Sequence, residues 1–285
     1  MCTVDLNQPK GIVMSKRVLL TGASTGIGFA TLQMLVADGH EVTSLDVKEA
    51  PAGAAVHHHC DLSDPASIDA VVAKLDGPYD AVLNVAGVAG SMGAELVLRV
   101  NVYGLRHLTE SLLAAGKITA PGGSIVNIAS LAGMAWDRHL DRINALEDAE
   151  DFAAGIEVAK AYDKGGPAAY ILSKEWVVAY TKRLAGRVVT QGIRVNSVSP
   201  GPVITPLFPY FETDAGKEQM AWMNEQVGRA AQPEDEAEAI CWLAVGRSGW
   251  VNGVDLPVDG GLQAGMAAGW ADTKASPASR ARRGA

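Results

Sequence analysis

The feature of this chain that most limits its possible folds is a glycine-rich stretch near the start, Thr21-Gly22-Ala23-Ser24-Thr25-Gly26-Ile27-Gly28. An apolar segment of strand length, Arg17-Val18-Leu19-Leu20, precedes it, and apolar residues at helical spacing follow it as far as Asp38-Gly39. Glycines let the backbone turn tightly and approach an anion, and a helix N-terminus presents N–H groups with partial positive charge. The order of strand, glycine turn and helix therefore predicts a nucleotide-binding turn.

An acidic residue at the end of the next predicted strand indicates which nucleotide this is. The strand, Glu41 to Leu45, ends at Asp46, eighteen residues after Gly28. An Asp there is placed to accept hydrogen bonds from an adenosine ribose and would repel a 2′-phosphate. No Arg or Lys within the glycine turn could neutralise such a phosphate. Both features favour NAD over NADP, the alternative being a solvated Asp at a strand end.

Composition and charge exclude several classes of partner. The net charge of −8 and the pI near 5.3 argue against binding to nucleic acid or an anionic membrane surface. The three cysteines, Cys2, Cys60 and Cys241, lack metal-ligand spacing and are typical of thiols in a reducing compartment. No apolar run approaches the roughly 18 residues that cross a bilayer, and the N-terminus is unlike a signal peptide. We expect a cytoplasmic protein.

The strand-like and helix-like segments alternate along the chain. With 285 residues, 48% of them hydrophobic, the chain can bury the core of one large domain. The alternation predicts an α/β fold with a single, doubly wound parallel sheet and helices on both faces. We expect this domain to span residues 14–267, after an N-terminal extension over 1–13 and before a flexible C-terminal tail over 268–285.

Ligands of such sheets bind beyond the carboxyl ends of the strands. The glycine turn, Asp46, Asn84, Ser130 and Pro200 all fall at predicted strand ends. The run His57-His58-His59 looks like a metal-binding cluster, but consecutive strand residues point to opposite faces of a sheet. We therefore expect no metal site.

A tyrosine and a lysine four residues apart, Tyr170 and Lys174, would lie on one face of a helix. A phenol titrates near pH 10 and acts as a base at neutral pH only where something lowers its pKa, such as a fixed cation. We expect Lys174 to lower the pKa of Tyr170, and Ser130 to hold the substrate oxygen by a hydrogen bond. Because such pairs also occur on solvated helix faces, this pair indicates catalysis only together with the other motifs.

Together these residues resemble one family, the short-chain dehydrogenase/reductases, over residues 16–263. The shared elements, in the order of the family, are Thr21-Gly22-x-x-x-Gly26-x-Gly28, Asp61-Leu62, Asn84-x-Ala86-Gly87, Asn101, Ser130, Tyr170-x-x-x-Lys174 and Pro200-Gly201-x-x-x-Thr205. The resemblance implies a Rossmann fold of seven strands and a nicotinamide cofactor, NAD. It also implies assembly as a homodimer or homotetramer.

The resemblance also implies the roles of particular residues. The implied catalytic set is Asn101, Ser130, Tyr170 and Lys174. In the family the asparagine holds a water that links the lysine to a proton relay, and the lysine binds the nicotinamide ribose. The implied cofactor-binding set adds the glycine turn and the strand ends: Gly22, Ser24, Thr25, Gly26, Ile27, Gly28, Asp46, Asp61, Leu62, Asn84, Ala86, Gly87, Tyr170, Lys174, Pro200, Gly201, Val203 and Thr205.

The chain departs from simpler members of the family between Ser130 and Tyr170, which lie forty residues apart. The insert, about 136–166, is charged and has partly helical apolar spacing, so we expect one or two extra helices near the mouth of the substrate site. It could wall the pocket, alter how subunits pair, or be a surface elaboration. A similar insert occurs in bacterial 3α-hydroxysteroid dehydrogenase/carbonyl reductases and coniferyl-alcohol dehydrogenases, and the phrase from Pro200 to Pro206 looks most like the latter.

A substrate lid is expected at about 205–230, where aromatic and Met side chains are concentrated. Such side chains beside a cofactor suit a flat or bulky apolar alcohol, although they could equally pack the lid against the domain. The candidate substrate residues are Ser130, Trp136, Tyr170, Leu207, Phe208 and Phe211.

The leading hypothesis is an NAD-dependent alcohol dehydrogenase for a hydrophobic secondary or allylic/aryl alcohol, which also reduces the matching carbonyl compound. One alternative is a regulator or scaffold that senses NAD without turnover, although such a protein has no need of Ser130, Tyr170 and Lys174. Another is a lyase or isomerase that retains its cofactor through a cycle, which net NADH formation would exclude.

Overall fold

The structure, a computed structural model, describes residues 14–149, 152–162 and 165–284. In this part of the chain the strands form one seven-stranded parallel sheet in the order β3-β2-β1-β4-β5-β6-β7. The strands are β1 (Arg17–Thr21), β2 (Glu41–Asp46), β3 (Val56–His59), β4 (Ala81–Asn84), β5 (Ser124–Ile128), β6 (Arg194–Pro200) and β7 (Asp255–Val258). The predicted Rossmann-type fold is confirmed, whereas the predicted N-terminal extension over 1–13 lies outside the described residues.

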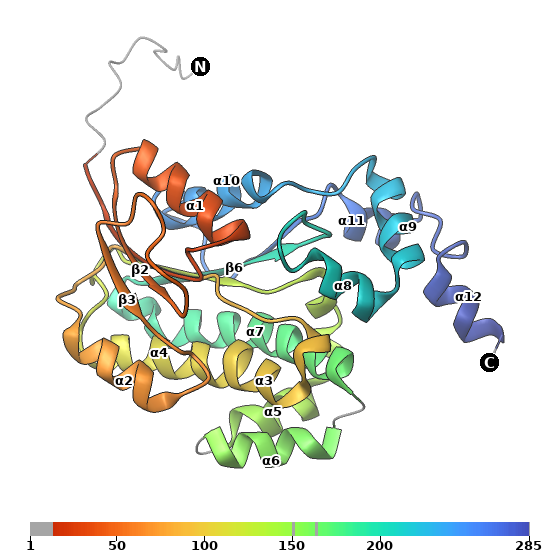
Figure 1. Ribbon diagram of the computed structural model, residues 1–285, viewed down its shortest axis with the longest axis horizontal. Helices are drawn as coiled ribbons and strands as arrows, with labels where there is room; N and C mark the ends of the chain where they lie inside the picture. Colours follow the sequence, from red (N-terminus) through yellow and green to blue (C-terminus); the bar gives the residue numbers. More distant parts are fainter. Residues whose placement is uncertain (1–13, 150–151, 163–164, 285) are drawn as a thin grey trace, which may run out of the picture.

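Helices cover both faces of the sheet (Figure 1). One face packs against α1 (Gly26–Ala37) and α10 (Pro233–Ala244), and the other against α2 (Pro65–Lys74), α4 (Leu105–Ala114) and α7 (Gly166–Val188). Along β1, Val18 and Leu20 pack on the face that α1 and α10 cover, whereas Leu19 packs on the opposite face. The side chains divide in this way because successive strand residues point to opposite faces of the sheet. Both faces are buried along the central strands, so consecutive residues of β1 and β4 are buried rather than alternately buried and exposed.

The order of the strands reverses at β1, which lies between β2 and β4. In doubly wound sheets ligands bind at this switch point, outside the carboxyl ends of the strands. The glycine turn follows β1 directly, and its Gly22 lies against Ala86 of the loop after β4, where an added Cβ would be 2.8 Å from the Ala86 backbone. The sheet thus brings the first motif and the Asn-x-Ala-Gly motif together at the switch point.

The insert forms the short helices α5 (Leu140–Glu147) and α6 (Phe152–Tyr162), which lie on the side of α7 and α4 away from the sheet (Figure 1). Its Ile143 and Leu146 are fully buried, and the ring of Phe152 lies 5.7 Å from that of Tyr103, measured between centroids. Helix α7 therefore has the sheet on one side and the insert on the other, so most of its residues are buried. The expected extra helices are present, and they cover α4 and α7.

The predicted lid contains α8 (Phe208–Ala215) and α9 (Lys217–Val227), which lie at one end of the molecule with α11 (Leu262–Ala268) and α12 (Pro277–Gly284) (Figure 1). The predicted tail over 268–285 includes α12, and its described part makes backbone hydrogen bonds to side chains of α9. The side chain of Gln219 accepts a hydrogen bond from the Ala278 N–H, and that of Gln226 accepts one from the Asp272 N–H, both at 3.0 Å. A weakly apolar segment is ordered here because its backbone N–H groups find partners on α9.

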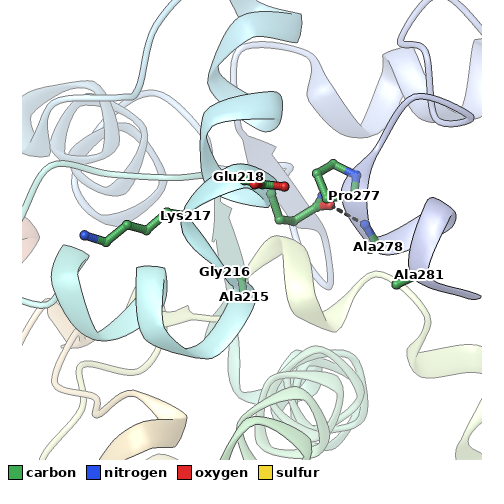
Figure 2. A pocket seen from close by; sticks show the side chains of 8 residues that line it. Ala215, Gly216, Lys217, Glu218, Pro277, Ala278 and Ala281 are labelled. Atoms are coloured by element: carbon green, nitrogen blue, oxygen red, sulfur yellow. Dashed lines mark hydrogen bonds between the residues drawn. The ribbon is translucent and has the colours of Figure 1, made fainter.

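A surface pocket of about 340 Å³ lies where this C-terminal segment meets the lid (Figure 2). Figure 2 shows Glu218 beside Pro277 and Ala278, at the junction of α9 and α12. None of the candidate catalytic residues lines this pocket.

No helix in the described ranges combines the length and the apolar character needed to cross a membrane.

Helix α10 buries one carboxylate that has no counter-charge. Glu236 is fully buried, and neither of its carboxylate oxygens has a hydrogen-bond partner among the described residues. Burial raises the pKa of this group to about 8, with smaller contributions from the charges of Asp235 and Asp259. The folded protein therefore retains a proton on Glu236 that the unfolded chain releases at lower pH.

We expect the Glu236→Met variant to be more stable than the wild type, by a difference in unfolding free energy that grows as the pH rises. An unfolded Glu ionises near pH 4.3, so between about pH 4 and 8 only the folded state holds this proton, and wild-type stability falls through that window. The pH-dependent gain is about 3–5 kcal/mol above pH 8. Urea unfolding at several pH values measures it, with exposed Glu238→Gln as control. If Glu236→Met and wild type lost stability in parallel, the assignment to Glu236 would be wrong.

Candidate active site

The glycine turn has the geometry that a dinucleotide phosphate requires. Gly22 and Gly26 have φ of +70° and +56°, a region that side-chain-bearing residues rarely adopt. An added Cβ at Gly28 would lie 2.0 Å from the Gly22 carbonyl oxygen, so only glycine lets the first turn of α1 pack on the loop. The side chain of Thr25, the residue before α1, makes no capping hydrogen bond. These features fit a bound pyrophosphate.

Asp46 stands beside this turn at the carboxyl end of β2. Its Oδ2 accepts a hydrogen bond from the Ser24 N–H, and its Oδ1 accepts one from the Lys48 N–H, each at 3.0 Å. The carboxylate is thus held next to the glycine turn, as expected of a group that binds an adenosine ribose. Negative charge at this position also disfavours a 2′-phosphate.

Two further strand-end loops reach the glycine turn. Ala86 contacts Gly22, and Gly87 lies against the Asn101 and Lys174 side chains, where its added Cβ would be 3.3 and 3.7 Å away. After β6, the Thr205 side chain lies over Gly26, 3.2 Å from its added Cβ. In the same loop Gly201 packs against Asp259, and Val203 forms a parallel bridge with Ala231 beside Pro202. The candidate cofactor residues thus come together from β1, β2, β4 and β6.

Two of the candidate cofactor residues have side chains occupied elsewhere. Asn84 is buried and its Nδ2 donates to Thr109 Oγ1 at 3.0 Å and Asn127 Oδ1 at 2.8 Å, so the side chain braces β4 against α4 and β5. Asp61 Oδ1 accepts hydrogen bonds from the N–H and hydroxyl of Ser63. The Asn84 side chain is therefore removed from the candidate cofactor contacts. The next residue, Leu62, is buried beneath Gly104.

Tyr170, Ser130 and Lys174 meet at the carboxyl end of β5. The Ser130 side chain lies near enough to the Tyr170 hydroxyl to lower its pKa, and the Lys174 Nζ lies 5.7 Å from the centroid of the Tyr170 ring. Lys174 is buried, and its Nζ donates to the Ile128 carbonyl oxygen at 2.8 Å. The α-helical spacing of four residues places phenol and ammonium on one face of α7, as predicted from the sequence.

The expected lowering of the Tyr170 pKa by Lys174 is not found in the structure. Burial raises the pKa of the Tyr170 phenol to about 12, the Ser130 hydrogen bond lowers it, and the charge of Asp214 raises it. Burial also lowers the pKa of Lys174 to about 8. The neighbouring cation favours the phenolate, but desolvation disfavours the charged form of both groups and outweighs it.

Asn101 lies in a π-helical segment, η2 (Arg99–Gly104), between α3 (Ala94–Leu98) and α4. Its Oδ1 accepts from the Val88 N–H and its Nδ2 donates to the Val88 carbonyl, both at 3.0 Å, and Nδ2 also reaches Ser173 Oγ at 3.3 Å. An asparagine is a poor helix residue, and single π turns occur often at functional sites. Here Asn101 joins the loop after β4 to α7, beside Lys174.

The lid brings one aromatic candidate to the site, and another candidate lies elsewhere. The ring of Phe211 in α8 lies 5.3 Å from that of Tyr170 between centroids, and Leu207 and Phe208 begin the same helix. The ring of Trp136 instead lies 5.6 Å from the Lys182 Nζ, two turns along α7 from Lys174. Trp136 is therefore not placed with Tyr170, because the insert turns away along α7.

The structure adds residues that the sequence motifs did not single out. Asp214 acts electrostatically on Tyr170, and its spacing of three residues from Phe211 could have revealed it. Glu175, buried directly after Lys174, accepts a hydrogen bond from His139 Nδ1 of the insert at 2.7 Å. Nothing in the local sequence around Glu175 links it to the insert, because this contact depends on tertiary packing.

Two family models match the chain. The model described as short chain dehydrogenase matches residues 16–139, and the one described as enoyl-(acyl carrier protein) reductase matches residues 154–263. The unmatched residues between them lie in the insert. The two models together cover the glycine turn, the Tyr-x-x-x-Lys pair and the loop after β6.

Relatives with known names align over most of the chain. The coniferyl-alcohol dehydrogenase of Pseudomonas sp. (strain HR199) is 33% identical over 87% of this chain and 96% of its own length. The 3-alpha-hydroxysteroid dehydrogenase/carbonyl reductase of Comamonas testosteroni is 30% identical over 87% of this chain and 97% of its own. The solved 3-alpha-hydroxysteroid dehydrogenase of Pseudomonas sp. B-0831, complexed with NADH, superposes with a TM-score of 0.76 at 30% identity, covering 88% of this chain and 98% of that one.

Proposed function

The chain belongs to the short-chain dehydrogenase/reductase family of oxidoreductases, and we propose that it interconverts a hydrophobic secondary or allylic/aryl alcohol and its carbonyl compound with NAD. The observation that carries this proposal is the meeting of Tyr170, Ser130 and Lys174 beside the glycine turn. A regulator that only senses NAD would have no use for a phenol, a hydroxyl and an ammonium assembled in this way.

NAD, when bound, would supply the hydride acceptor or donor, and its oxidised ring carries a positive charge that favours a nearby phenolate. The glycine turn would hold the pyrophosphate, Asp46 the adenosine ribose, and Lys174 the nicotinamide ribose. Val203 and Thr205 would contact the carboxamide end, consistent with the position of Thr205 over Gly26. These roles use groups that the fold already holds close together.

Tyr170 would move the proton. In oxidation its phenolate takes the proton of the substrate hydroxyl, and in reduction the phenol returns it to the carbonyl oxygen. Ser130 would hold that oxygen, since its hydroxyl already reaches the Tyr170 side chain. The ammonium of Lys174 favours the phenolate, and Asn101 would connect Lys174 to solvent through a water.

The substrate class is supported by the lid and by the relatives. Phe211 packs near Tyr170, and an aromatic wall beside the reacting oxygen suits a flat or bulky apolar alcohol. Two relatives that align over most of the chain at 30% identity or more are named for coniferyl alcohol and 3-alpha-hydroxysteroids. We therefore propose a substrate of one of these two kinds.

NADH formation at 340 nm with a panel of alcohols tests this proposal. The panel contains coniferyl and cinnamyl alcohols, 3α-hydroxysteroids and small alicyclic alcohols, each with NAD and with NADP. Oxidation of one chemical class with NAD is the expected result. Tight NAD binding without turnover of any alcohol would instead favour an NAD-sensing regulator or scaffold.

Replacing Asp46 with Ala is expected to reduce the preference for NAD over NADP about ten- to hundredfold, since hydrogen bonds to a charged acceptor are lost and repulsion of a 2′-phosphate is removed. The ratio of the two kcat/KM values measures this effect. Glu49→Gln, which removes an exposed carboxylate three residues away, is the matched control and should keep the wild-type ratio. An unchanged ratio in Asp46→Ala would show that another residue selects the cofactor.

We also propose that the protein assembles as a homodimer or homotetramer in the cytoplasm. Trp242 of α10 and Trp250 in the loop after it are 43% and 100% exposed, which is costly for a monomer. Two cysteines, Cys60 and Cys241, are buried as free thiols, which fits a reducing compartment. Light scattering of the purified protein measures the assembly.

A further inference from the structure

The lid helix α8 presents a carboxylate to the candidate reaction centre. Residues three apart on a helix share one face, and α8 carries Phe211 and Asp214 at this spacing. The Phe211 ring packs 5.3 Å from the Tyr170 ring, which fixes the direction of that face. The charge of Asp214 also acts on Tyr170 and raises the pKa of its phenol. Asp214 therefore faces Tyr170 and not the solvent side of the lid.

This carboxylate has no partner within the described part of the protein. Both Asp214 oxygens are buried and neither accepts a hydrogen bond there. By contrast, Asp259, which follows β7 directly, accepts hydrogen bonds from the Gly261 and Gln263 N–H groups. A buried, unpaired carboxylate is costly, so its presence beside a substrate site indicates a partner that arrives with the ligand.

The chemistry of the site limits what this partner is. An ionised carboxylate is only an acceptor, so the ligand must supply a donor. Lys174 already places an ammonium 5.7 Å from the Tyr170 ring, and a second cation nearby would be repelled. From the lid, the apolar ring of Phe211 packs against Tyr170. A neutral hydroxyl on an otherwise apolar molecule satisfies all three conditions.

We propose that Asp214 is a specificity residue that accepts a hydrogen bond from a second hydroxyl, alcoholic or phenolic, of the alcohol bound at Tyr170. This inference rests on the proposed function and narrows its substrate class, from apolar alcohols in general to apolar alcohols that carry another hydroxyl group. An alcohol without that group would leave Asp214 buried and unpaired, and would bind less well.

The test compares ligands that differ by a single hydroxyl. The pairs are 4-hydroxycinnamyl against cinnamyl alcohol, and 1,2- and 1,4-cyclohexanediol against cyclohexanol. Calorimetry with the protein saturated with NADH gives a dissociation constant for each alcohol, because alcohol and NADH form a complex that does not react. The variants are Asp214→Leu and Asp214→Asn, with exposed Glu218→Gln of the neighbouring helix as the matched control for lid charge.

In the wild type and in Glu218→Gln, we expect the hydroxyl-bearing member of at least one pair to bind about tenfold to a hundredfold more tightly, the usual range for a hydrogen bond to a charged acceptor. Asp214→Leu should remove this preference by weakening only that member, and Asp214→Asn should retain part of it. Equal binding within every pair would overturn the proposal. So would an Asp214→Leu variant that weakens both members alike or weakens only NADH, since the carboxylate would then serve the fold or the cofactor.

Measuring NADH formation with the same alcohols separates this inference from the proposed function. A hydroxyl preference that depends on Asp214, without oxidation of any alcohol by NAD, would support the role of Asp214 and overturn the proposed reaction. Oxidation of both members of every pair with equal kcat/KM would support the proposed reaction and overturn the role of Asp214. Preference for an amino alcohol over the matching diol would overturn the assignment of a neutral hydroxyl.

Discussion

Tyr170→Phe is expected to lower kcat for alcohol oxidation about a thousandfold, within the usual contribution of a positioned acid/base group. The variant keeps the aromatic ring that packs 5.3 Å from Phe211 and loses only the hydroxyl that Ser130 contacts. Proton transfer at the substrate oxygen then has no donor or acceptor in the protein. Because the ring remains, we expect the lid and the glycine turn to be undisturbed and NADH to bind as in the wild type.

Steady-state kinetics and fluorescence titration of NADH measure these two quantities separately. Tyr210→Phe, at an exposed tyrosine of the same lid helix, is the matched control and should keep full activity. A Tyr170→Phe variant that retains more than about a tenth of the wild-type kcat would show that another group carries the proton.

The pH dependence gives a second measurement on the same residue. Burial raises the pKa of the Tyr170 phenol to about 12. Oxidation requires the phenolate, whose fraction increases as pH approaches this value, so kcat/KM for oxidation should keep rising from about pH 7 to 10. This rising limb should be absent from the residual activity of Tyr170→Phe.

Gly28→Ala is expected to lose dinucleotide binding by at least about a hundredfold and to destabilise the protein by about 2–4 kcal/mol. An added Cβ would lie 2.0 Å from the Gly22 carbonyl oxygen and 2.7 Å from its carbonyl carbon, and both are backbone atoms that no side-chain rotation can move. The first turn of α1 would have to shift away from β1. That shift would also displace the N–H groups that are to hold the phosphates.

The matched control for this substitution is Gly186→Ala. Gly186 is an exposed residue within α7, and an added Cβ there meets no atom within 4 Å. Alanine should stabilise that helix by about 0.5–1 kcal/mol and leave binding unchanged. Urea unfolding and NADH titration of both variants make the comparison. Unimpaired NADH binding by Gly28→Ala would contradict the assignment of this turn to the phosphates.

The fold, and the way in which the main candidate site residues come together, were predictable from sequence because they depend on local order and on one topological rule. A strand, a glycine turn and a helix determine the phosphate turn, and the spacing of Tyr170 and Lys174 determines one helix face. Parallel strands then bring their carboxyl ends to one edge, which unites Gly22, Ala86 and Ser130 although the chain separates them. None of these steps requires knowledge of side-chain packing.

Predictions that depended on packing were less successful. The Asn84 side chain turns to Thr109 and Asn127, and Trp136 follows the insert toward Lys182. The C-terminal residues are ordered because Gln219 and Gln226 of α9 bind their backbone. Each outcome rests on contacts between segments far apart in the sequence, which no local pattern encodes.

The sequence by itself thus determined the doubly wound sheet, the dinucleotide turn and the set of groups that meet at Tyr170, since periodicity and chain order suffice for these. Only the tertiary structure decided the environment of those groups. Burial raises the pKa of the Tyr170 phenol to about 12 and lowers that of Lys174 to about 8. The path of α8 likewise places the unpaired carboxylate of Asp214 beside them. Desolvation and proximity arise only when the chain is folded, so the sequence names the residues and the fold sets their chemistry.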